Sequence, residues 1–340
     1  MENIELDLIK CFLCPHECLL KEGQIGLCGV RKAYGDGVKL EGYSRISTMV
    51  IEPIEKKPFY HFHPGSKVLS VGGSGCNLCC NFCQNSNISQ KKSVDGCKYF
   101  SPSAIANLAV SKGCSSVCMT YTEPIIYYEF LMDLADKCKK QNLNFAINTN
   151  AYAKEQPWTD ILRVVDALNI DWKGKDSIYY DKCGANKFKK ITVKERIEQS
   201  FDNGNHIELS IPVYRDSNVD DFEDILSFKI KNVNEKSRVP VHVLKILPTD
   251  ENLNEASDDD SVFEVAELLQ SGFHFVYVHN IFNEKAREFR QTVCPDCGRI
   301  IATREALKAN IKLSYKCCTC KEIFRYESNR EKRVFKKKEK

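Results

Sequence analysis

The most constraining feature of this sequence is a loop with three closely spaced cysteines, Cys76, Cys80 and Cys83, in the run GSGCNLCCNFCQN. Their spacing, C-x3-C-x2-C, is one thiolate short of the four that normally hold a four-iron cluster. One iron would therefore keep an open coordination position, and an open position is where metal chemistry takes place. A zinc knot, or buried thiols at an accidental spacing, would explain the same residues without that chemistry.

The composition is typical of a globular protein in a reducing compartment. Of the 340 residues, 43% are hydrophobic and 28% are charged. The net charge of +3 gives no electrostatic reason to expect nucleic acid as a partner. The first residues, MENIELDLIK, lack the apolar segment of a signal peptide, and no run of 18 apolar residues predicts a membrane span. Because 18 cysteines occur without an export signal, we expect metal ligands rather than disulfides, and a cytoplasmic, oxygen-sensitive protein.

Between the cysteine loop and Cys294, the hydrophobic pattern alternates between strands and helices. An apolar run at 67–73 predicts the strand that leads into the loop, and 101–113 has helical periodicity with Ser at its start and Gly at its end. About seven such strands are separated by helical segments of roughly ten to eighteen residues, which is typical of parallel βαβ units. We therefore expect an α/β fold, a partial (β/α)6-type barrel over residues 41–285, with its functional site at the C-terminal ends of the strands.

The loop and its surroundings resemble the radical S-adenosylmethionine (SAM) superfamily. The matching features are the cysteine spacing, the aromatic residue Phe82 before the last cysteine, the Gly-rich approach and the preceding strand. In that superfamily the open iron is chelated by the amino and carboxylate groups of SAM. One electron from the cluster then cleaves SAM to methionine and a 5′-deoxyadenosyl radical, which abstracts a hydrogen atom from the substrate. The resemblance implies a radical SAM barrel with a [4Fe–4S] cluster held by the three cysteines of the loop.

Polar residues at the ends of the later predicted strands extend the resemblance to SAM binding. The run TYTEP resembles the GGE segment that receives the SAM amino group, and its candidate residues are Thr122, Glu123 and Pro124. Asn150, in NTNAY, is a candidate for binding the ribose or the carboxylate. Asp171 and Lys173, in DWKG, resemble the D-x-K pair of glycyl-radical-enzyme activases, which lies near the methionine end of SAM. Each residue alone would equally suit a helix cap, a turn or a surface ion pair, but their recurrence at successive strand ends favours one common site.

The resemblance narrows to the activase-related proteins that accompany Memo and AMMECR proteins, the AmmeMemoRadiSam proteins, which are related to pyruvate formate-lyase activating enzyme. It covers the runs IEPIEKKPFYHFHPGS, CPHEC, TYTEP, DWKG and CPDCG, and so nearly the whole chain. Three positions depart from this group, which more often has Thr at Ser74, Gly at Ala151 and Leu at Trp172. The segment 242–260 departs further. Because its start lies at a strand end on the substrate side, the departure suggests a different substrate.

Two further cysteine groups flank the predicted barrel. Residues 286–326 contain the CxxC…CxxC arrangement of a zinc ribbon, with candidate ligands Cys294, Cys297, Cys317 and Cys320. Residues 1–40 contain a second set, Cys11, Cys14, Cys18 and Cys28. We expect zinc at the ribbon and either zinc or an auxiliary iron–sulfur cluster at the N-terminal group, where zinc is preferred because nothing in the sequence demands a second redox centre. Cys79 and Cys318 lie beside these ligands as expected bystanders, and the charged tail 327–340 predicts a solvated, disordered segment.

Five aromatic or histidine residues could serve either at the functional site or in packing. Tyr60, His61 and His63 precede the first predicted strand, where they would form a wall or proton donor near the site, or pack a β-hairpin against the barrel. His242 and His279 lie on later predicted strands, and His279 ends its strand, where it could reach the active face. The sequence does not separate catalysis from packing for these five side chains.

The predicted function is that of a radical SAM oxidoreductase similar to the activating enzymes. A glycyl hydrogen on a partner enzyme is one expected substrate, and a small molecule or a peptide side chain fits as well. A non-catalytic, metal-stabilised binding protein is an alternative of a different class, and it would not turn over SAM. The resemblance also implies a low-potential electron donor as a partner, whereas a membrane or nucleic acid is not expected.

Overall fold

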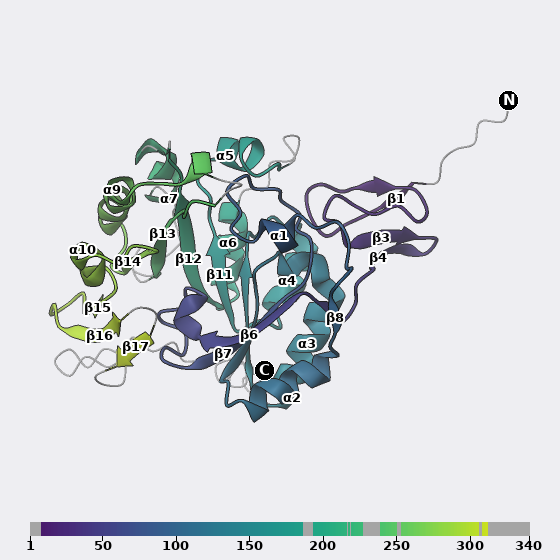
Figure 1. Ribbon diagram of the computed structural model, residues 1–340, viewed down its shortest axis with the longest axis horizontal. Helices are drawn as coiled ribbons and strands as arrows, with labels where there is room; N and C mark the ends of the chain where they lie inside the picture. The colour runs from purple at the N-terminus through teal and green to yellow at the C-terminus, as the bar shows by residue number, and fades with distance from the viewer. Residues whose placement is uncertain are drawn as a thin grey trace, which may run out of the picture.

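Eight strands form the central sheet of the computed structural model, in the order β14-β13-β12-β11-β10-β9-β7-β6 (Figure 1). The structure describes residues 8–185, 193–215, 217, 219–226, 239–249, 253–305 and 308–311. The strands of this sheet are β6 (Thr48–Pro53), β7 (Lys67–Gly72), β9 (Ser116–Met119), β10 (Asn144–Thr149), β11 (Ala167–Asp171), β12 (His206–Val213), β13 (Val241–Lys245) and β14 (Val276–His279). Strand β6 pairs antiparallel with β7, and all the other neighbours in the sheet are parallel.

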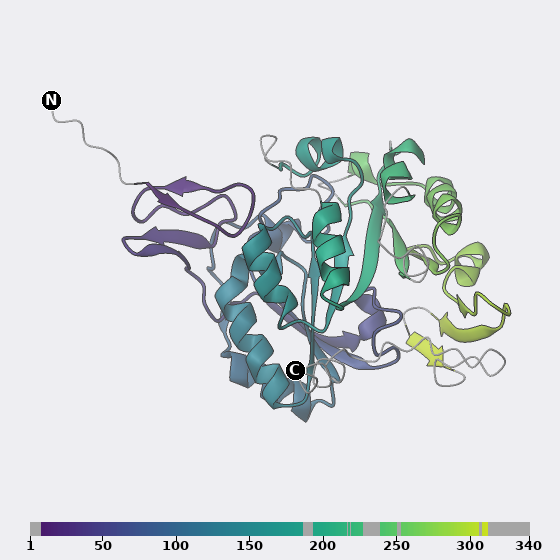
Figure 2. The same ribbon diagram turned by 180° about the vertical axis from the view of Figure 1, so that it is seen from behind.

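The parallel strands follow one another in chain order, which is how a barrel winds. The crossovers contain α1 (Ser86–Ser89), α2 (Pro102–Ser111), α3 (Tyr128–Lys140), α4 (Glu155–Leu162), α5 (Asp176–Asp181), α6 (Val193–Asp202), α7 (Glu223–Leu226) and α9 (Asp259–Gln270). The 3-10 turns among them are η2 (Pro124–Tyr127), η3 (Val219–Phe222) and η4 (Leu253–Glu255). Seen from behind, α3, α4 and α6 lie in front of the sheet (Figure 2). The predicted α/β class and mainly parallel sheet are confirmed, and they are consistent with a partial radical SAM barrel.

Local sequence explains where these elements begin and how they are buried. Every residue of β9 and β12 is buried, as expected for parallel strands covered on both faces. Helix α2 begins at the predicted Ser cap, because Ser101 accepts a hydrogen bond from the backbone N–H of Ala104 and Pro102 occupies the first turn. Helix α9 begins in the same way, with Asp258 accepting from the N–H of Ser261 at 2.8 Å.

A segment that follows β6 passes beneath the interior of the sheet and forms a floor. It starts with η1 (Ile54–Lys56) and continues over residues 57–62. Glu208 on β12 accepts hydrogen bonds from the successive N–H groups of Tyr60, His61 and Phe62, at 2.8, 2.9 and 3.1 Å. The side chains of Asn148 and Asn169 donate to the carbonyl oxygens of residues 57 and 58, at 3.2 and 2.8 Å. Since Asn148, Asn169 and Glu208 are level in the sheet register, one polar row across three strands holds the floor in place.

Histidine and tyrosine side chains complete the floor. His242 bonds to Glu208 at 2.7 Å and to His279 at 2.8 Å, and His61 bonds to Tyr277 at 2.7 Å. These side chains are buried, with Tyr60 packed among them. Burial lowers the pKa of His61 to about 3, so its imidazole is neutral at physiological pH. The packing interpretation of these residues therefore accounts for their contacts.

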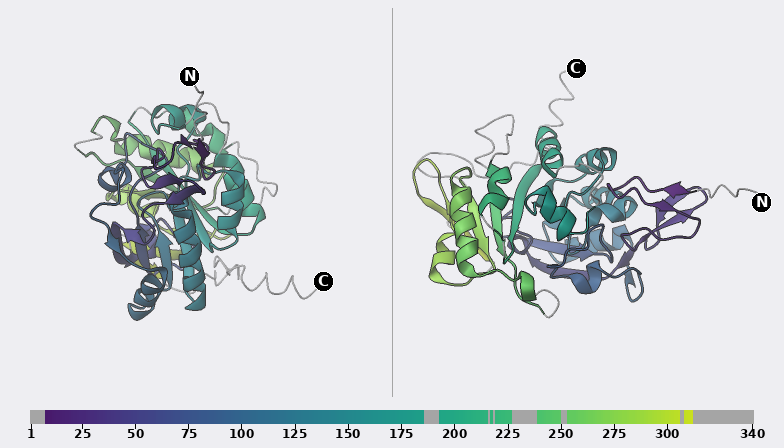
Figure 3. Two further views of the ribbon diagram at one scale, coloured as in Figure 1. Left: turned by 90° about the vertical axis from the view of Figure 1, so that its right-hand side faces the viewer. Right: turned by 90° about the horizontal axis from the view of Figure 1, so that it is seen from above.

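Smaller sheets lie at the two ends of the molecule (Figure 3). At one end are the hairpins β1 (Ile9–Lys10) with β2 (Leu19–Leu20) and β3 (Arg31–Tyr34) with β4 (Gly37–Leu40). At the other are α10 (Glu284–Glu288) and the sheet of β15 (Thr292–Val293), β16 (Ile300–Glu305) and β17 (Lys308–Ile311). A further pair, β5 (Arg45–Ile46) with β8 (Lys98–Tyr99), joins the segment before the sheet to the first crossover. Among the described residues, no helix is long and apolar enough to cross a membrane.

The predicted zinc ribbon is described only in its first half. Cys294 is buried and Cys297 is exposed, in a tight turn in which the N–H of Gly298 donates to the carbonyl oxygen of Cys294. Cys317 and Cys320 lie outside the described residues, as does the tail 327–340. Zinc at the ribbon therefore stays a prediction.

Candidate functional site

A cavity of about 380 Å³ lies at the C-terminal ends of the parallel strands. Its wall brings together residues that are far apart in the sequence and were predicted as one site: Cys76, Cys80, Phe82, Cys83, Thr122, Glu123, Asn150, Asp171 and Lys173. Pro124 is the exception, because it is buried at the start of η2 and does not line the cavity. The expectation that the site lies at the C-terminal ends of the strands therefore agrees with the structure. Eight strand-end and loop side chains, together with Phe82, line this one cavity.

The cysteine loop leaves β7 and is fixed by contacts to distant segments. The N–H of Ser74 donates to the hydroxyl of Tyr127 at 2.8 Å. The N–H of Cys79 donates to the carbonyl oxygen of Cys183 at 2.9 Å. Gly75 adopts φ +78°, and a Cβ there would lie 2.2 Å from the carbonyl oxygen of Cys28. Glycine is therefore required for both its backbone conformation and its lack of a side chain, which explains the Gly-rich approach to the loop.

The three thiols of the loop are buried or half-buried and influence one another. Burial, with the negative charges of Glu123 and the neighbouring thiols, raises the pKa of Cys76 well above its usual value. Burial also raises the pKa of Cys83. The pKa of Cys80 is lowered, because Cys183 hydrogen-bonds to it and Lys173 adds a positive charge. Buried thiols lose their protons when a nearby positive charge stabilises the thiolates, and the iron ions of a bound cluster would supply that charge.

The space around the thiols suits a cluster of several atoms. In the described part of the chain, no three His, Cys, Asp or Glu side chains converge as a single metal ion requires. Cys76, Cys80 and Cys83 line the common cavity instead, together with polar side chains such as Asn150 and Lys173. The residues present therefore fit a [4Fe–4S] cluster with one iron that no protein thiol of the loop ligates.

Glu123 connects the TYTEP segment to the end of β10. One carboxylate oxygen accepts from the N–H of Ile125 at 3.1 Å and the hydroxyl of Thr149 at 2.7 Å, and the other accepts from the N–H of Asn150 at 2.8 Å. Burial raises the pKa of Glu123 to about 7, although these hydrogen bonds oppose the shift. A carboxylate has roughly four acceptor positions, of which these bonds use three. An ammonium group in the cavity would meet the fourth.

Asn150 connects β10 to the cysteine loop. Its amide nitrogen donates to the side-chain oxygen of Asn77 at 2.9 Å, and its own oxygen accepts from the N–H of Tyr152 at 2.9 Å. Ala151, between them, has φ +53°, a left-handed conformation that favours glycine. Glycine would adopt this conformation without strain, which agrees with the departure noted at Ala151 in the sequence.

Asp171 and Lys173 lie two residues apart and both line the cavity, as their spacing predicts. The ammonium of Lys173 lies 3.3 Å from a carboxylate oxygen of Asp171 and 5.5 Å from the centre of the Phe82 ring. Burial opposes the charge of Lys173, but Asp171 and the thiols of Cys80 and Cys183 outweigh burial and hold its pKa well above the usual value. The cavity therefore contains a fixed cation beside a cluster-loop thiol.

Several residues of the site were not predicted from the sequence. The cavity wall also includes Lys56 and Lys57 from the floor, together with Tyr121, Lys245 and Asn280. Lys57 pairs with Glu52 at 2.7 Å and lies over the Tyr121 ring, 3.9 Å from its centre. The run KKPF was visible as part of the family resemblance, but its spacing did not show that it passes beneath the strands. Cys183, next to Cys80, gave no signal, because it lies in no cysteine group.

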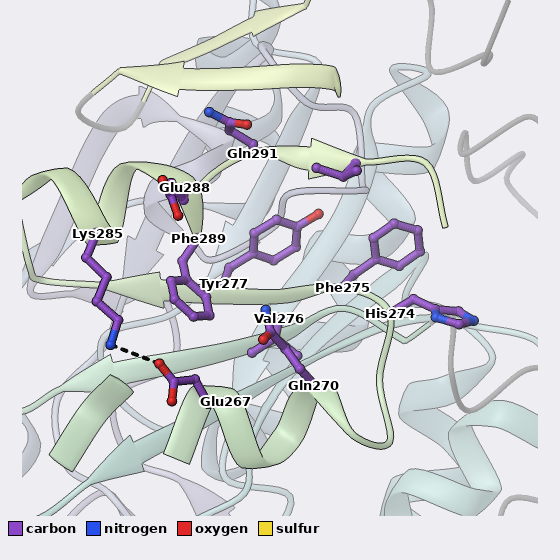
Figure 4. A pocket seen from close by; sticks show the side chains of 11 residues that line it. Glu267, Gln270, His274, Phe275, Val276, Tyr277, Lys285, Glu288, Phe289 and Gln291 are labelled. Atoms are coloured by element: carbon purple, nitrogen blue, oxygen red, sulfur yellow. Dashed lines mark ion pairs between the residues drawn. The ribbon is translucent and has the colours of Figure 1, made fainter. Parts of the chain in front are cut away.

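A second cavity, beside the start of β14, contains none of the predicted residues (Figure 4). It encloses about 380 Å³ between α9, α10 and β14. The ion pair of Lys285 with Glu267, at 2.9 Å, crosses one side of it, and Tyr277 and Phe289 form much of the wall. It lacks thiols and lies away from the strand ends that carry the polar residues, so the first cavity is the candidate site.

Comparisons with known proteins point in the same direction. A model of the Radical SAM superfamily matches residues 70–228. Uncharacterized protein MJ0808 of Methanocaldococcus jannaschii is 31% identical over 317 residues, which cover 91% of this chain and 92% of that protein. The 4-hydroxyphenylacetate decarboxylase activating enzyme of Clostridium scatologenes is 28% identical over 120 residues, which cover 34% of this chain and 38% of that enzyme.

A solved structure shares the fold. A radical SAM methyltransferase from Sphaerobacter thermophilus superposes with a TM-score of 0.50 at 13% identity, covering 70% of this chain and 71% of that chain. At this identity the likeness concerns the fold alone.

Proposed function

The chain belongs to the radical SAM superfamily, and we propose that it is an enzyme that binds a [4Fe–4S] cluster through Cys76, Cys80 and Cys83 and cleaves SAM reductively. The observation that carries the proposal is the single cavity shared by these thiols and the polar strand-end residues. When bound, the cluster and SAM supply one electron and a 5′-deoxyadenosyl radical, which abstracts a hydrogen atom from the substrate.

The residues of the cavity would hold the charged groups of SAM. The carboxylate of Glu123 is fixed by three hydrogen bonds and faces the cavity, where it would accept a hydrogen bond from the SAM ammonium. Lys173 would bind the SAM carboxylate, because it is a buried cation next to the thiols. Asn150 would bond to the ribose or carboxylate, and Thr122 and Phe82 would complete the wall. The floor residues Lys56 and Lys57 close the space from below and help to exclude water.

We propose a glycyl hydrogen on a partner enzyme as the substrate. The D-x-K pair at Asp171 and Lys173 and the similarity to an activating enzyme support this choice. A small molecule or a peptide side chain is the second candidate, because the segment 242–260 departs from the similar proteins and its residues Leu244, Lys245 and Ile246 line the cavity. In either case a low-potential donor must supply one electron to the cluster.

The test is SAM turnover by the anaerobically reconstituted protein. We expect 5′-deoxyadenosine and methionine when dithionite is the reductant. The Cys76→Ala variant should lose both the cluster spectrum and the product, whereas Cys79→Ala is the matched control and should keep them. Cleavage at the wild-type rate by Cys76→Ala, or no cleavage by wild-type protein that carries a full cluster, would overturn the proposal. The second result would favour a metal-stabilised binding protein.

A further inference from the structure

The cysteine loop separates the candidate site from a smaller cavity of about 120 Å³. We call this space the outer cavity, and its wall includes Leu27, Cys76, Cys79, Ser89, Lys91 and Lys92. Cys76 and Ser89 also belong to the wall of the candidate site. The hydroxyl of Ser89 lies 3.2 Å from the sulfur of Cys83, so both shared residues belong to or contact the proposed cluster ligands. A single layer of residues therefore divides the two cavities at this point.

The outer cavity lies at the surface of the molecule. Leu27 is 62% exposed, and Cys79, Lys92 and Gly184 on the same wall are exposed as well. A partner that covers these residues would therefore come within one residue of the thiol of Cys76, without entering the candidate site.

Neighbouring segments hold the wall of the outer cavity in place. On one side, the Nε2 atom of His16 lies 2.7 Å from the carbonyl oxygen of Asn77. On the other, Gly29 has φ +82°, and a Cβ there would lie 2.6 Å from the Cα atom of Lys92, so the backbones of these two segments are in close contact. The surface is therefore formed before a partner binds, which lowers the cost of association.

The charges of the wall indicate a partner with negative charge. Lys91 and Lys92 carry positive charge, and the described part of the wall contains no carboxylate side chain. Beside them, the exposed Leu27 offers an apolar contact. An apolar centre with a polar rim is the usual anatomy of a protein interface, and transient redox complexes need only a small one. Two neighbouring cations would also steer an acidic protein to this place.

The position of the outer cavity selects the kind of partner. The proposed function requires one electron to reach the loop while SAM and the substrate fill the candidate site. A carrier of that electron must therefore approach the loop from elsewhere, and the outer cavity offers such an approach because Cys76 lines both spaces. A protein substrate cannot use it, since the hydrogen that the substrate loses has to enter the candidate site.

We propose that the outer cavity, with Leu27, Lys91 and Lys92 in its wall, is the docking site for an acidic one-electron carrier protein with an iron–sulfur or flavin centre. The proposal rests on the function proposed above, which requires the electron. Lys91 and Lys92 pair with carboxylates of the carrier, and Leu27 packs against an apolar side chain of the carrier. The carrier is oxidised by one electron and the loop cluster is reduced by one, and no bond is formed or broken.

The first experiment reverses the two charges. The wild type and the Lys91→Glu, Lys92→Glu double variant are reconstituted anaerobically. Binding of a flavodoxin and of a ferredoxin is then measured, together with reduction of the loop cluster by each reduced carrier. We expect the carrier to associate with the variant about tenfold or more slowly at low salt. The difference should shrink as the salt concentration rises, because ions screen surface charges. The affinity for SAM and its cleavage with dithionite should stay at wild-type values, since neither depends on the carrier.

Two further variants make the test specific. Lys139→Glu, Lys140→Glu on α3 changes the net charge by the same amount and should bind the carrier as the wild type does. Leu27→Ser removes the apolar contact without a change of charge, and the carrier should dissociate from it several times faster than from the wild type.

Carrier binding and cluster reduction at wild-type rates in the double variant would overturn the proposal, as would the absence of carrier binding to the wild type. An equal loss in the α3 variant would overturn it as well, because the overall charge and not this cavity would then attract the carrier. Absence of dithionite-driven SAM cleavage in the wild type would instead contradict the proposed function, so the two failures are distinguishable.

Discussion

The buried cation of Lys173 offers the sharpest test of the proposed SAM site. The side chain of Lys173 is only 8% exposed, and its ammonium lies 3.3 Å from Asp171 at the edge of the cavity. Lys173→Met removes the charge and nearly preserves the length and apolar volume of the side chain. We therefore expect the variant to fold and to bind iron, and to lose one charge-assisted contact with the SAM carboxylate.

The size of the loss follows from the type of contact. A hydrogen bond between charged groups contributes about 1.5–3 kcal/mol to binding. Its loss should raise the dissociation constant for SAM roughly 10- to 150-fold. Asp171→Ala should fall in the same range if its carboxylate contacts SAM directly. The side chain of Asp171 is 38% exposed and lies beside Lys173, so it could instead act by orienting the ammonium. In that case the double variant should bind SAM no more weakly than Lys173→Met alone.

Isothermal titration of SAM onto anaerobically reconstituted protein measures these affinities at matched iron content. Lys140→Met, which removes a surface cation paired with Asp136 on α3, is the matched control and should not change the affinity. A dissociation constant for Lys173→Met within about twofold of the wild-type value, at full iron content, would refute the role of Lys173. It would also mean that the DWKG match reflects structure and not SAM binding.

Three further results are expected. Cys80→Ala should abolish the loop cluster and SAM cleavage, whereas Cys79→Ala should leave both nearly unchanged, as iron analysis and product assay will show. Glu208→Gln should lower the free energy of unfolding by about 3–5 kcal/mol at pH 7, because it removes the charge that holds the floor segment, and chemical denaturation measures this. Burial raises the pKa of Glu208, but hydrogen bonds and charges of His206 and His242 outweigh burial and hold it well below the usual value of 4.5. The stabilisation by the Glu208 carboxylate is therefore fully present above pH 4.5 and is lost as the pH falls through the folded-state pKa. The difference in unfolding free energy between the variant and the wild type should shrink in acid. Changing Cys294 and Cys297 to Ser should release about one zinc per chain and leave the loop cluster spectrum intact, and loss of that spectrum with the fold preserved would contradict separate metal sites.

Sequence reasoning located most of the cavity because its signals are local. A strand followed by a cysteine loop, and polar residues such as Glu123 and Asp171 at the ends of buried strands, are patterns within short windows. The parallel arrangement then brings strand ends to one edge, so residues far apart in the sequence meet without any further information. Pro124 does not line the cavity, because it begins η2 and is buried there.

The floor of the barrel could not be predicted, because it depends on contacts across the whole chain. Glu208 lies on a strand far from residues 60–62, and a lone Glu in an apolar strand gives no indication of its partners. Only the structure shows that it accepts three successive backbone N–H groups. Buried backbone groups must find partners, and this carboxylate meets that need for a segment that belongs to neither sheet nor helix. The aromatic run therefore resembled a hairpin in the sequence and is a floor in the structure.

The conformation of the cysteine loop also depends on residues outside its motif. On one side, the carbonyl oxygen of Cys28 contacts Gly75 so closely that no side chain fits. On the other, Gly184 has φ +65°, and a Cβ there would lie 2.3 Å from the sulfur of Cys79. Cys79 thus packs against the α5 connection, although it is not expected to bind metal, while Cys183 beside it bonds to Cys80. Three spaced cysteines define what the loop can bind, but the segments on either side determine where the thiols stand. A loop transplanted without Gly184 and the N-terminal group would therefore keep its ligands and lose their geometry.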